Sequence, residues 1–213
     1  IQLSGLFNGR IENFKFTKMK IDVGNTHLSG SINMDGLPNI NETFMVIDLR
    51  NSIVDPLDLS FLFNENTINR LAPMGMLSMD GQFLGYPTDF VANGNFTGVL
   101  GEVRSDINFK VNEQDFDRSV YTGSLSLKSF AIGTYLNDTI TFQKVSMDGK
   151  ISGRGLSRNR ADFQLNGHIY SIGVKGYNYT NIVTDARLAA ERFNGLISIN
   201  DPNLELKAVG SID

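Results

Sequence analysis

Polar and apolar residues alternate one by one along most of this sequence, and this alternation limits its fold more than any other feature. From Ala161 to Ile169, apolar residues and one glycine take the odd positions while polar residues take the even ones. The same period of two recurs at 90–100, 103–111, 121–127, 145–153 and 204–212. Side chains of a β-strand point alternately to its two faces, so each run predicts a strand with one apolar and one wet face. The sequence therefore predicts an all-β protein.

Glycine shares the apolar positions of these runs. The glycines with this placement are Gly5, Gly30, Gly81, Gly94, Gly123, Gly149, Gly167, Gly195 and Gly210. Glycine inside a strand costs stability because it packs nothing and loses entropy on folding. Its repeated use indicates bends with bulges, close approach of neighbouring backbones, or room for something else. A strongly curved, mostly antiparallel sheet satisfies all three readings.

Helix and turn signals are few. Asp55-Pro56 is typical of a helix start, and Ala72-Pro73 ends the run that follows, so we expect short helices at 56–63 and 67–71. Met-Asp-Gly occurs three times. The copy ending at Gly36 predicts a turn, whereas those ending at Gly81 and Gly149 lie inside alternating runs and predict strands.

The residues needed for most catalytic and metal chemistry are missing. Cysteine is absent, which removes disulfides and thiolate chemistry, and His27 and His168 are the two histidines. Each histidine stands in a strand pattern without a neighbouring acid, so we expect outward-facing polar residues. No glycine-rich phosphate loop joins a strand to a helix. We therefore expect a protein that is not an enzyme, with no metal and no cofactor.

Charge and hydropathy exclude two further classes of protein. The chain carries 19 basic and 23 acidic residues, a net charge of −4, without the basic clusters that nucleic-acid binding requires. No apolar run approaches the length of a membrane helix, and no signal peptide is present.

The chain begins at Ile1 and ends at Asp213 directly after a strand-like run. These ends predict one continuous segment, 1–213, of a longer protein.

An ordered set of motifs in residues 77–213 resembles the AsmA-like superfamily. They are Tyr121 to Gly133 (YTGSLSLKSFAIG), Val145 to Gly155 (VSMDGKISGRG), Gly176 to Ile182 (GYNYTNI), Phe193 to Ile199 (FNGLISI) and Asp201 to Leu206 (DPNLEL). Within that superfamily the order is similar to TamB proteins (translocation and assembly module inner-membrane subunits) of the Bacteroides–Flavobacterium group. The first 76 residues share only the general pattern of the superfamily, through Leu28-Ser-Gly-Ser-Ile32 and the interruption of the strand pattern by helix signals near Pro56.

The resemblance implies a long sheet folded over into an open hydrophobic trough, a β-taco-like shape. It also implies a periplasmic location, as part of a protein anchored in the inner membrane of a Gram-negative bacterium. The implied partners are phospholipid or other acyl-chain cargo and an outer-membrane barrel of the TamA or BamA type. The implied roles are phospholipid movement between the two membranes and outer-membrane protein assembly.

The alternation and the resemblance together give candidate residues for the lining of such a trough. These are Phe83, Phe96, Phe109, Leu125, Leu127, Ile151, Phe163, Leu165, Ile169, Phe193, Ile197, Leu204, Leu206 and Ile212. An acyl chain gains roughly 0.8 kcal/mol per buried methylene, so a wide apolar trough is stabilised by lipid. Two alternatives predict the same alternation: a structural or adhesive β module with a closed core and no cargo, and a carbohydrate-binding or hydrolytic sandwich.

Overall fold

The computed structural model describes residues 1–60, 68, 72–155, 160–189 and 192–212. Thirteen strands follow one another in sequence order, and every pair of neighbouring strands within each compact unit is antiparallel. The chain divides into two compact units, Ile1–Leu100 and Gly101–Asp213. The prediction of an all-β fold with an open, mostly antiparallel sheet is confirmed.

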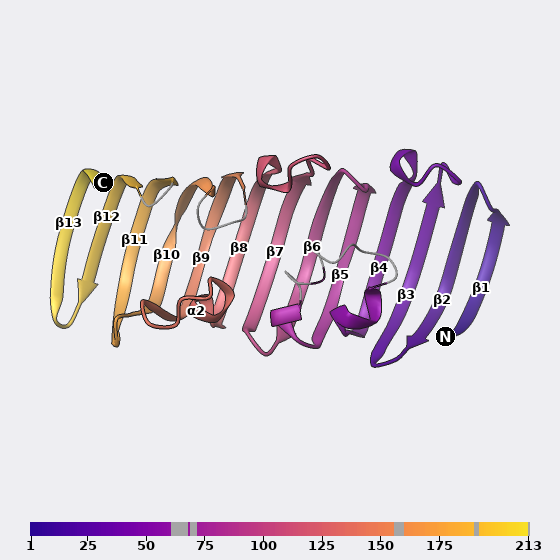
Figure 1. Cartoon of the computed structure of the whole chain (residues 1–213), viewed down its shortest axis with the longest axis horizontal. Coiled ribbons are helices and arrows are strands. Elements are labelled where there is room, and N and C mark those ends of the chain that lie inside the picture. Colours follow the sequence, from indigo (N-terminus) through magenta and orange to yellow (C-terminus); the bar gives the residue numbers. More distant parts are fainter. Residues whose placement is uncertain (61–67, 69–71, 156–159, 190–191, 213) are drawn as a thin grey trace. The chain divides into compact units, whose positions relative to one another are not determined.

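Unit 1 is a meander in which each strand pairs with the next (Figure 1). Its strands are β1 (Gln2–Arg10), β2 (Asn13–Val23), β3 (Thr26–Asp35), β4 (Phe44–Val54), β5 (Leu77–Tyr86) and β6 (Asp89–Gly98). In the described part of this unit they are accompanied by the 3-10 helices η1 (Ile40–Glu42), η2 (Pro56–Leu59) and η3 (Ala72–Met74). Gly36 lies in the turn after β3, as its Met-Asp-Gly motif predicts, and Gly81 lies inside β5.

Unit 2 is likewise a meander in which each strand pairs with the next (Figure 1). Its strands are β7 (Gly101–Lys110), β8 (Val120–Phe130), β9 (Phe142–Arg154), β10 (Asp162–Val174), β11 (Tyr177–Ala189), β12 (Arg192–Asp201) and β13 (Leu204–Ile212). The 3-10 helix η4 (Phe116–Arg118) connects β7 to β8, and the short helix α2 (Ile132–Tyr135) connects β8 to β9. The sequence signals did not predict α2, because it is one turn long and has no capping side chain.

The predicted helical break begins where expected. The Asp55 side chain accepts a hydrogen bond from the backbone N–H of Leu57, and Pro56 occupies the first turn of η2. This turn is a 3-10 helix and not an α-helix, and residues 61–63, 67 and 69–71 of the two predicted helices lie outside the described residues. Across the described part of the chain, no helix is long and apolar enough to cross a membrane.

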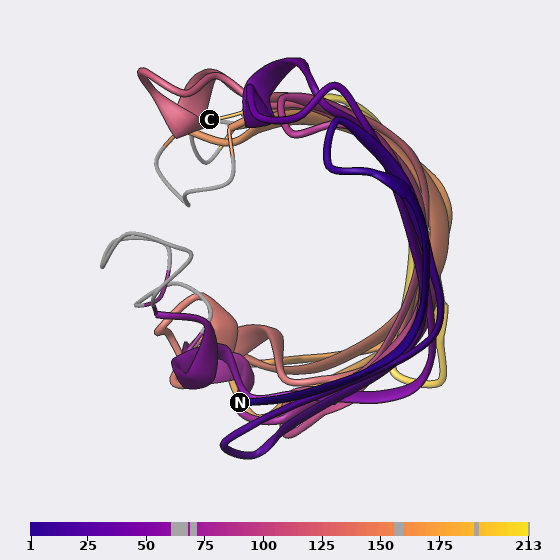
Figure 2. The same ribbon diagram turned by 90° about the vertical axis from the view of Figure 1, so that its right-hand side faces the viewer.

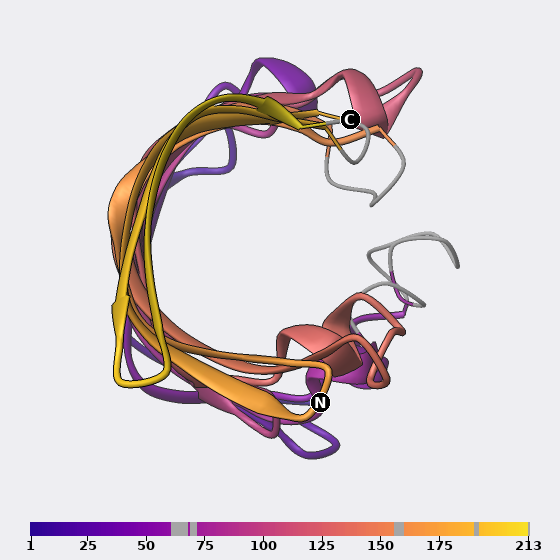
Figure 3. The same ribbon diagram turned by 90° about the vertical axis from the view of Figure 1, so that its left-hand side faces the viewer.

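The strands of both units bend along their length. Figure 2 shows the bend in unit 1 (indigo to magenta) and Figure 3 shows it in unit 2 (orange to yellow). In unit 2, α2 lies on the inner side of this arc, at one end of the strands (Figure 3). Ile132 of α2 packs against a buried cluster that contains Leu127, Val145 and Met147. The apolar face of unit 2 is therefore the concave face.

Glycine provides close backbone approach in these bent strands. A Cβ atom on Gly81 would lie 2.5 Å from the carbonyl oxygen of Asn93 and 2.9 Å from the Cα of Gly94. A Cβ atom on Gly167 would lie 2.5 Å from the carbonyl oxygen of Asp148. Neighbouring strands thus approach one another on the apolar face at positions where a side chain does not fit.

The β-bulges, in contrast, lie mainly at residues other than glycine. Lys18, Asn51 and Ser129 have φ angles of 50°, 47° and 50°, and each lies within a shift of strand register. Gly5 lies at a fourth register shift, between Ser4 and Leu6. Of the three explanations for glycine on the apolar face, β-bulges therefore account for few of the positions, and close backbone approach accounts for more of them.

Candidate functional site

The strand register of unit 2 aligns its apolar residues into four cross-strand rows. Residues that are directly opposite on neighbouring strands share a face of the sheet. The register therefore shows which side chains form one surface without reference to their exposure.

Each row takes one residue from each of β7 to β13. The aromatic row is Phe109, Tyr121, Gly153, Phe163, Leu188, Phe193 and Ile212. The first middle row is Ile107, Gly123, Ile151, Leu165, Ala186, Gly195 and Gly210. The second middle row is Ser105, Leu125, Gly149, Gly167, Thr184, Ile197 and Ala208. The aliphatic row is Val103, Leu127, Met147, Ile169, Ile182, Ile199 and Leu206.

Most of the candidate lining residues fall on these rows. Eleven of the twelve candidates in unit 2 do so, and the exception, Leu204, pairs with Asp201 at the start of β13. Leu127 and Leu165 are buried and Leu206 is exposed, whereas the other candidates on these rows whose side chains are described are half-buried. Ile212 is opposite Phe193, but its side chain lies outside the described residues.

The two candidates in unit 1 belong to a separate apolar face. Phe83 is in a row with Phe7, Phe16, Ile32, Ile47 and Ala92. Its ring stacks on Phe90 with the centroids 4.5 Å apart, and Phe96 is opposite Met79. Both candidate side chains are half-buried.

Large side chains concentrate in the outer rows of unit 2, and small ones in the two middle rows. Where strands bend, side chains on the concave side converge, so small residues relieve crowding at the middle of the strands. Ala186 is fully buried, and Leu165 Cδ1 would lie 3.1 Å from a Cβ atom on Gly149. Neighbouring side chains thus fill part of the space that glycine provides, and the concave face is a continuous apolar layer.

Sequence reasoning omitted several residues of this layer. The buried cluster of unit 2 contains Val145 and Met147, and Leu188 packs against it. On β11, Ile182, Thr184, Ala186 and Leu188 do alternate, but Val183 on the outer face and the small residues weaken the signal. Counting the period over the whole of β11 would have identified this strand.

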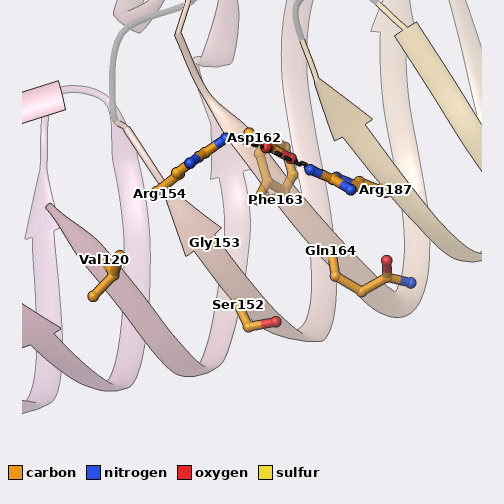
Figure 4. Close-up of a pocket in the computed structure, with 8 residues that line it drawn as sticks. All are labelled: Val120, Ser152, Gly153, Arg154, Asp162, Phe163, Gln164 and Arg187. Carbon is orange, nitrogen blue, oxygen red and sulfur yellow. Dashed lines mark hydrogen bonds and ion pairs between the residues drawn. The ribbon is translucent and has the colours of Figure 1, made fainter. Parts of the chain in front are cut away.

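The opposite face of unit 2 is polar and carries a shallow pocket of about 420 Å³ near the ends of β8 to β11. Its lining includes Arg154, Asp162, Arg187 and Phe163 (Figure 4). Asp162 accepts hydrogen bonds from Arg187 Nε at 2.6 Å and Nη2 at 2.7 Å, and from Arg154 Nη2 at 3.2 Å. The Arg187 hydrogen bond is the main cause that lowers the pKa of Asp162.

Both histidines lie on polar surface, and each has an acidic residue opposite it on the neighbouring strand that the sequence analysis did not anticipate: Asp22 for His27 and Asp148 for His168. His27 Nδ1 lies 2.6 Å from Asp22 Oδ1, because the β2–β3 hairpin places the two residues opposite one another. His168 Nε2 contacts Asn181 Oδ1 at 2.9 Å. Among the described residues, no three His, Asp or Glu side chains gather as a metal site would require.

A buried carboxylate fixes the turn between β12 and β13. Asp201 accepts hydrogen bonds from the Tyr177 hydroxyl, from the Thr180 backbone N–H and hydroxyl, and from the Asn203 backbone N–H. The Tyr177 hydrogen bond is the largest cause that lowers the pKa of Asp201 to about 2. This network explains the Asp-Pro-Asn-Leu motif as a structural staple of the hairpin.

Comparison with known proteins identifies no relative of this chain. No family model, no curated protein and no solved structure matches it. The resemblance to AsmA-like proteins therefore stays a prediction from the sequence motifs.

Proposed function

We propose that this chain is a segment of an AsmA-like lipid conduit, which carries phospholipid along its apolar face between the inner and outer membranes. In this proposal the segment works in the periplasm, within a longer protein anchored in the inner membrane. An outer-membrane barrel is its partner, and support of outer-membrane protein assembly is a second role of the same protein. The segment itself performs no chemistry.

One observation carries the proposal: the concave apolar face of unit 2 has no second sheet over it in the part of the chain that the structure describes (Figure 3). Apolar sheet faces are normally covered by another layer of secondary structure. Here α2 covers one end of the strands, and the candidates Leu125, Ile151 and Ile197 remain half-buried. An acyl chain is a suitable cover, because burying it gains on the order of 10 kcal/mol before entropy costs.

If the chain is a structural module, something other than lipid has to cover its apolar face. A core closed by a second sheet is absent from the described residues of each unit, so in this reading the apolar face binds another protein chain. Lipid is favoured because the face consists mainly of aliphatic and aromatic groups, and the hydroxyl of its buried Thr184 already donates to the Leu196 carbonyl oxygen. Such a surface suits cargo that has to move.

The test compares two adjacent residues that point to opposite faces of β12. Ile197 lies on the concave face between Thr184 and Ala208, whereas Ser198 lies on the polar face between Val183 and Lys207. Ile197→Asp introduces a negative charge on the concave face, where the proposal places the lipid. Ser198→Asp introduces the same charge on the polar face of the same strand. We expect the wild type and Ser198→Asp to take up a fluorescent fatty acid and to retain phospholipid in native mass spectrometry.

Ile197→Asp should bind at least about tenfold less fatty acid, since an unpaired charge beside an acyl chain costs several kcal/mol. Circular dichroism of both variants establishes that the strands are retained. Absence of lipid from the wild type, or equal uptake by the two variants, would contradict the proposal.

A further inference from the structure

Three strands of unit 1 lose their alternation of polar and apolar residues at the same end. Residues 44–47 near the start of β4 read FMVI, and residues 83–86 at the end of β5 read FLGY. Residues 90–92 near the start of β6 read FVA. Unbroken apolar runs are typical of strands that are covered on both faces. This end of β4 to β6 is therefore apolar on the face that carries Phe83, the Phe83 face, and also on the face behind it.

The strand register gathers the apolar residues of that second face into one patch. Val46, Leu84 and Val91 are directly opposite one another across β4, β5 and β6. One row nearer the strand ends, the rings of Phe44 and Tyr86 meet edge to face with their centroids 5.4 Å apart. These five residues form the outer patch. Phe44, Leu84 and Tyr86 are 37%, 41% and 43% exposed, and the two valines are half-buried.

Polar residues limit the size of the outer patch. Asn33 is opposite Val46 on β3. The next row along the strands on this face is Ser31, Asp48, Gln82 and Asn93. The patch spans about 10 Å across three strands and about 7 Å along them. An α-helix with its side chains is about 10–12 Å across, so a single helix is wide enough to cover the patch. A contiguous exposed apolar area with a polar border is typical of an interaction site.

A carboxylate lies on each side of the outer patch. Asp35 is opposite Phe44 on β3, and Asp89 is opposite Tyr86 on β6. Residues that are directly opposite share a face of the sheet, so both aspartates lie on the same face as the patch. Their strands are three spacings apart, about 14 Å, which is the rise of about ten residues of an α-helix. A helix that crosses the patch therefore reaches both aspartates.

The wider surroundings of the patch are also acidic. Residues 33–50 and 82–93, all of which the structure describes, contain four carboxylates (Asp35, Glu42, Asp48 and Asp89) and one basic residue, Arg50. Arg50 Nε lies 2.7 Å from Asp48 Oδ1 on the same strand. Lys15 belongs to the same row as Val46 but lies on β2, two strands away. A second copy of the patch or an anionic membrane would bring like charges together here, whereas a cationic partner is complementary.

We propose that the outer patch docks a basic amphipathic helix of a partner protein. The apolar side chains of this helix pack on Leu84 and on the Phe44–Tyr86 pair, and its lysine or arginine side chains lie near Asp35 and Asp89. The helix then supplies the second layer that an apolar sheet face normally has. The inference goes beyond the proposed function and is independent of it, because the patch lies behind the Phe83 face and docking leaves that face accessible.

The test uses two synthetic helical peptides with the same stripe of leucines, one with lysine and the other with glutamate at every flanking position. Fluorescence anisotropy measures their binding to the whole chain. At low salt the lysine peptide should bind at least about tenfold more tightly than the glutamate peptide, and added salt should reduce the difference. Phe44→Thr/Leu84→Thr should weaken binding of the lysine peptide at least about tenfold, since buried apolar anchors dominate interfaces. Threonine keeps the strand propensity of these positions.

A second variant tests the charge without removing apolar contacts. Asp35→Asn changes one exposed side chain and keeps its shape, so it tests the proposal even if the double variant does not fold. It should weaken binding of the lysine peptide about threefold at low salt and leave binding of the glutamate peptide no weaker than before. Circular dichroism establishes that both variants retain their strands.

The matched control is Val183→Thr, which makes the same kind of change at a 48% exposed apolar residue on the polar face of β11. It should bind the lysine peptide as the wild type does. Equal binding of the two peptides, absence of binding, or equal losses in the patch and control variants would overturn the proposal.

Two further measurements test the other occupants of the outer patch. Sedimentation of the wild type reports self-association, and flotation with phosphatidylglycerol vesicles reports membrane binding. We expect neither to depend on the patch. Self-association that Phe44→Thr/Leu84→Thr abolishes would assign the patch to a second copy of the chain, and flotation that the same variant abolishes would assign it to a membrane surface. Either result would overturn the partner helix.

Discussion

Replacing Gly167 with alanine tests whether β9 and β10 approach one another too closely at this position to accept a side chain. Gly149 and Gly167 are directly opposite on β9 and β10, so they form a matched pair. A Cβ atom on Gly167 would lie 2.5 Å from the carbonyl oxygen of Asp148 and 2.8 Å from the Cα of Gly149. A Cβ atom on Gly149 would lie 3.0 Å from the carbonyl oxygen of Asn166 and 3.1 Å from Leu165 Cδ1. The first substitution requires a backbone shift, and the second requires a much smaller one.

The expected magnitudes follow from this difference. Overpacking a tight site costs about 1–3 kcal/mol. Alanine recovers about 0.4–1 kcal/mol by restricting the unfolded chain. Gly167→Ala should therefore lower the free energy of unfolding by about 1–2 kcal/mol. For Gly149→Ala the two effects roughly cancel, and we expect a change within about 0.5 kcal/mol.

Urea unfolding followed by tyrosine fluorescence is a suitable assay. The chain has no tryptophan, and five of its six tyrosines lie in unit 2: Tyr121, Tyr135, Tyr170, Tyr177 and Tyr179. The signal therefore reports mainly on the unit that carries the substitution. With a slope of about 2 kcal/mol per molar urea, Gly167→Ala should lower the midpoint by roughly 0.5–1 M. Equal midpoints for Gly167→Ala and the wild type, or a larger loss for Gly149→Ala, would refute the reasoning.

Two further predictions concern pH. The pKa of Asp201, about 2, lies below its unfolded value of about 3.9, so its contribution to stability is present above about pH 4 and is lost as the pH falls toward 2. Asp201→Asn should make the melting temperature depend less on pH between about pH 2 and neutral pH. An unchanged pH dependence would contradict the role of Asp201 in stabilising the turn. Burial raises the pKa of Tyr121 to about 12, so its stabilisation is present below about pH 10 and is lost as the pH rises through 12. Tyr121→Phe should remove the last step of the tyrosinate absorbance titration, and persistence of that step would assign it to another tyrosine.

Periodicity alone predicted β6 to β10 and β13, because a strand with one apolar face has a sequence period of two, but it did not identify β11. It could not predict where that period changes phase. In β8 the apolar residues run on odd numbers as far as Leu127, and after the bulge at Ser129 the face continues at Phe130. One extra residue reverses the face of everything that follows it. Ser129 carries no signal for a positive φ angle that would reveal the bulge beforehand.

The sequence predicted that the candidate residues lie on apolar strand faces, but it could not predict which of them are neighbours in the sheet. Alternation assigns Leu125 and Ile151 to apolar faces, but only the register shows that they belong to neighbouring rows. The pocket at Asp162 depends on three strands, since its two arginines come from β9 and β11. Residues so far apart in sequence give no local pattern, so the sequence did not predict this cluster.

The order of the strands also constrains how such a chain grows. Within each unit every strand pairs with the strands before and after it in sequence, as in proteins built from stacked repeats. Folding can then start at any hairpin and spread outward, and stability becomes a sum of contributions from adjacent strands. Because the strands alternate in direction, loss of a single strand reverses every strand beyond it, whereas loss of a hairpin preserves their direction. Length in this architecture should therefore change in steps of two strands.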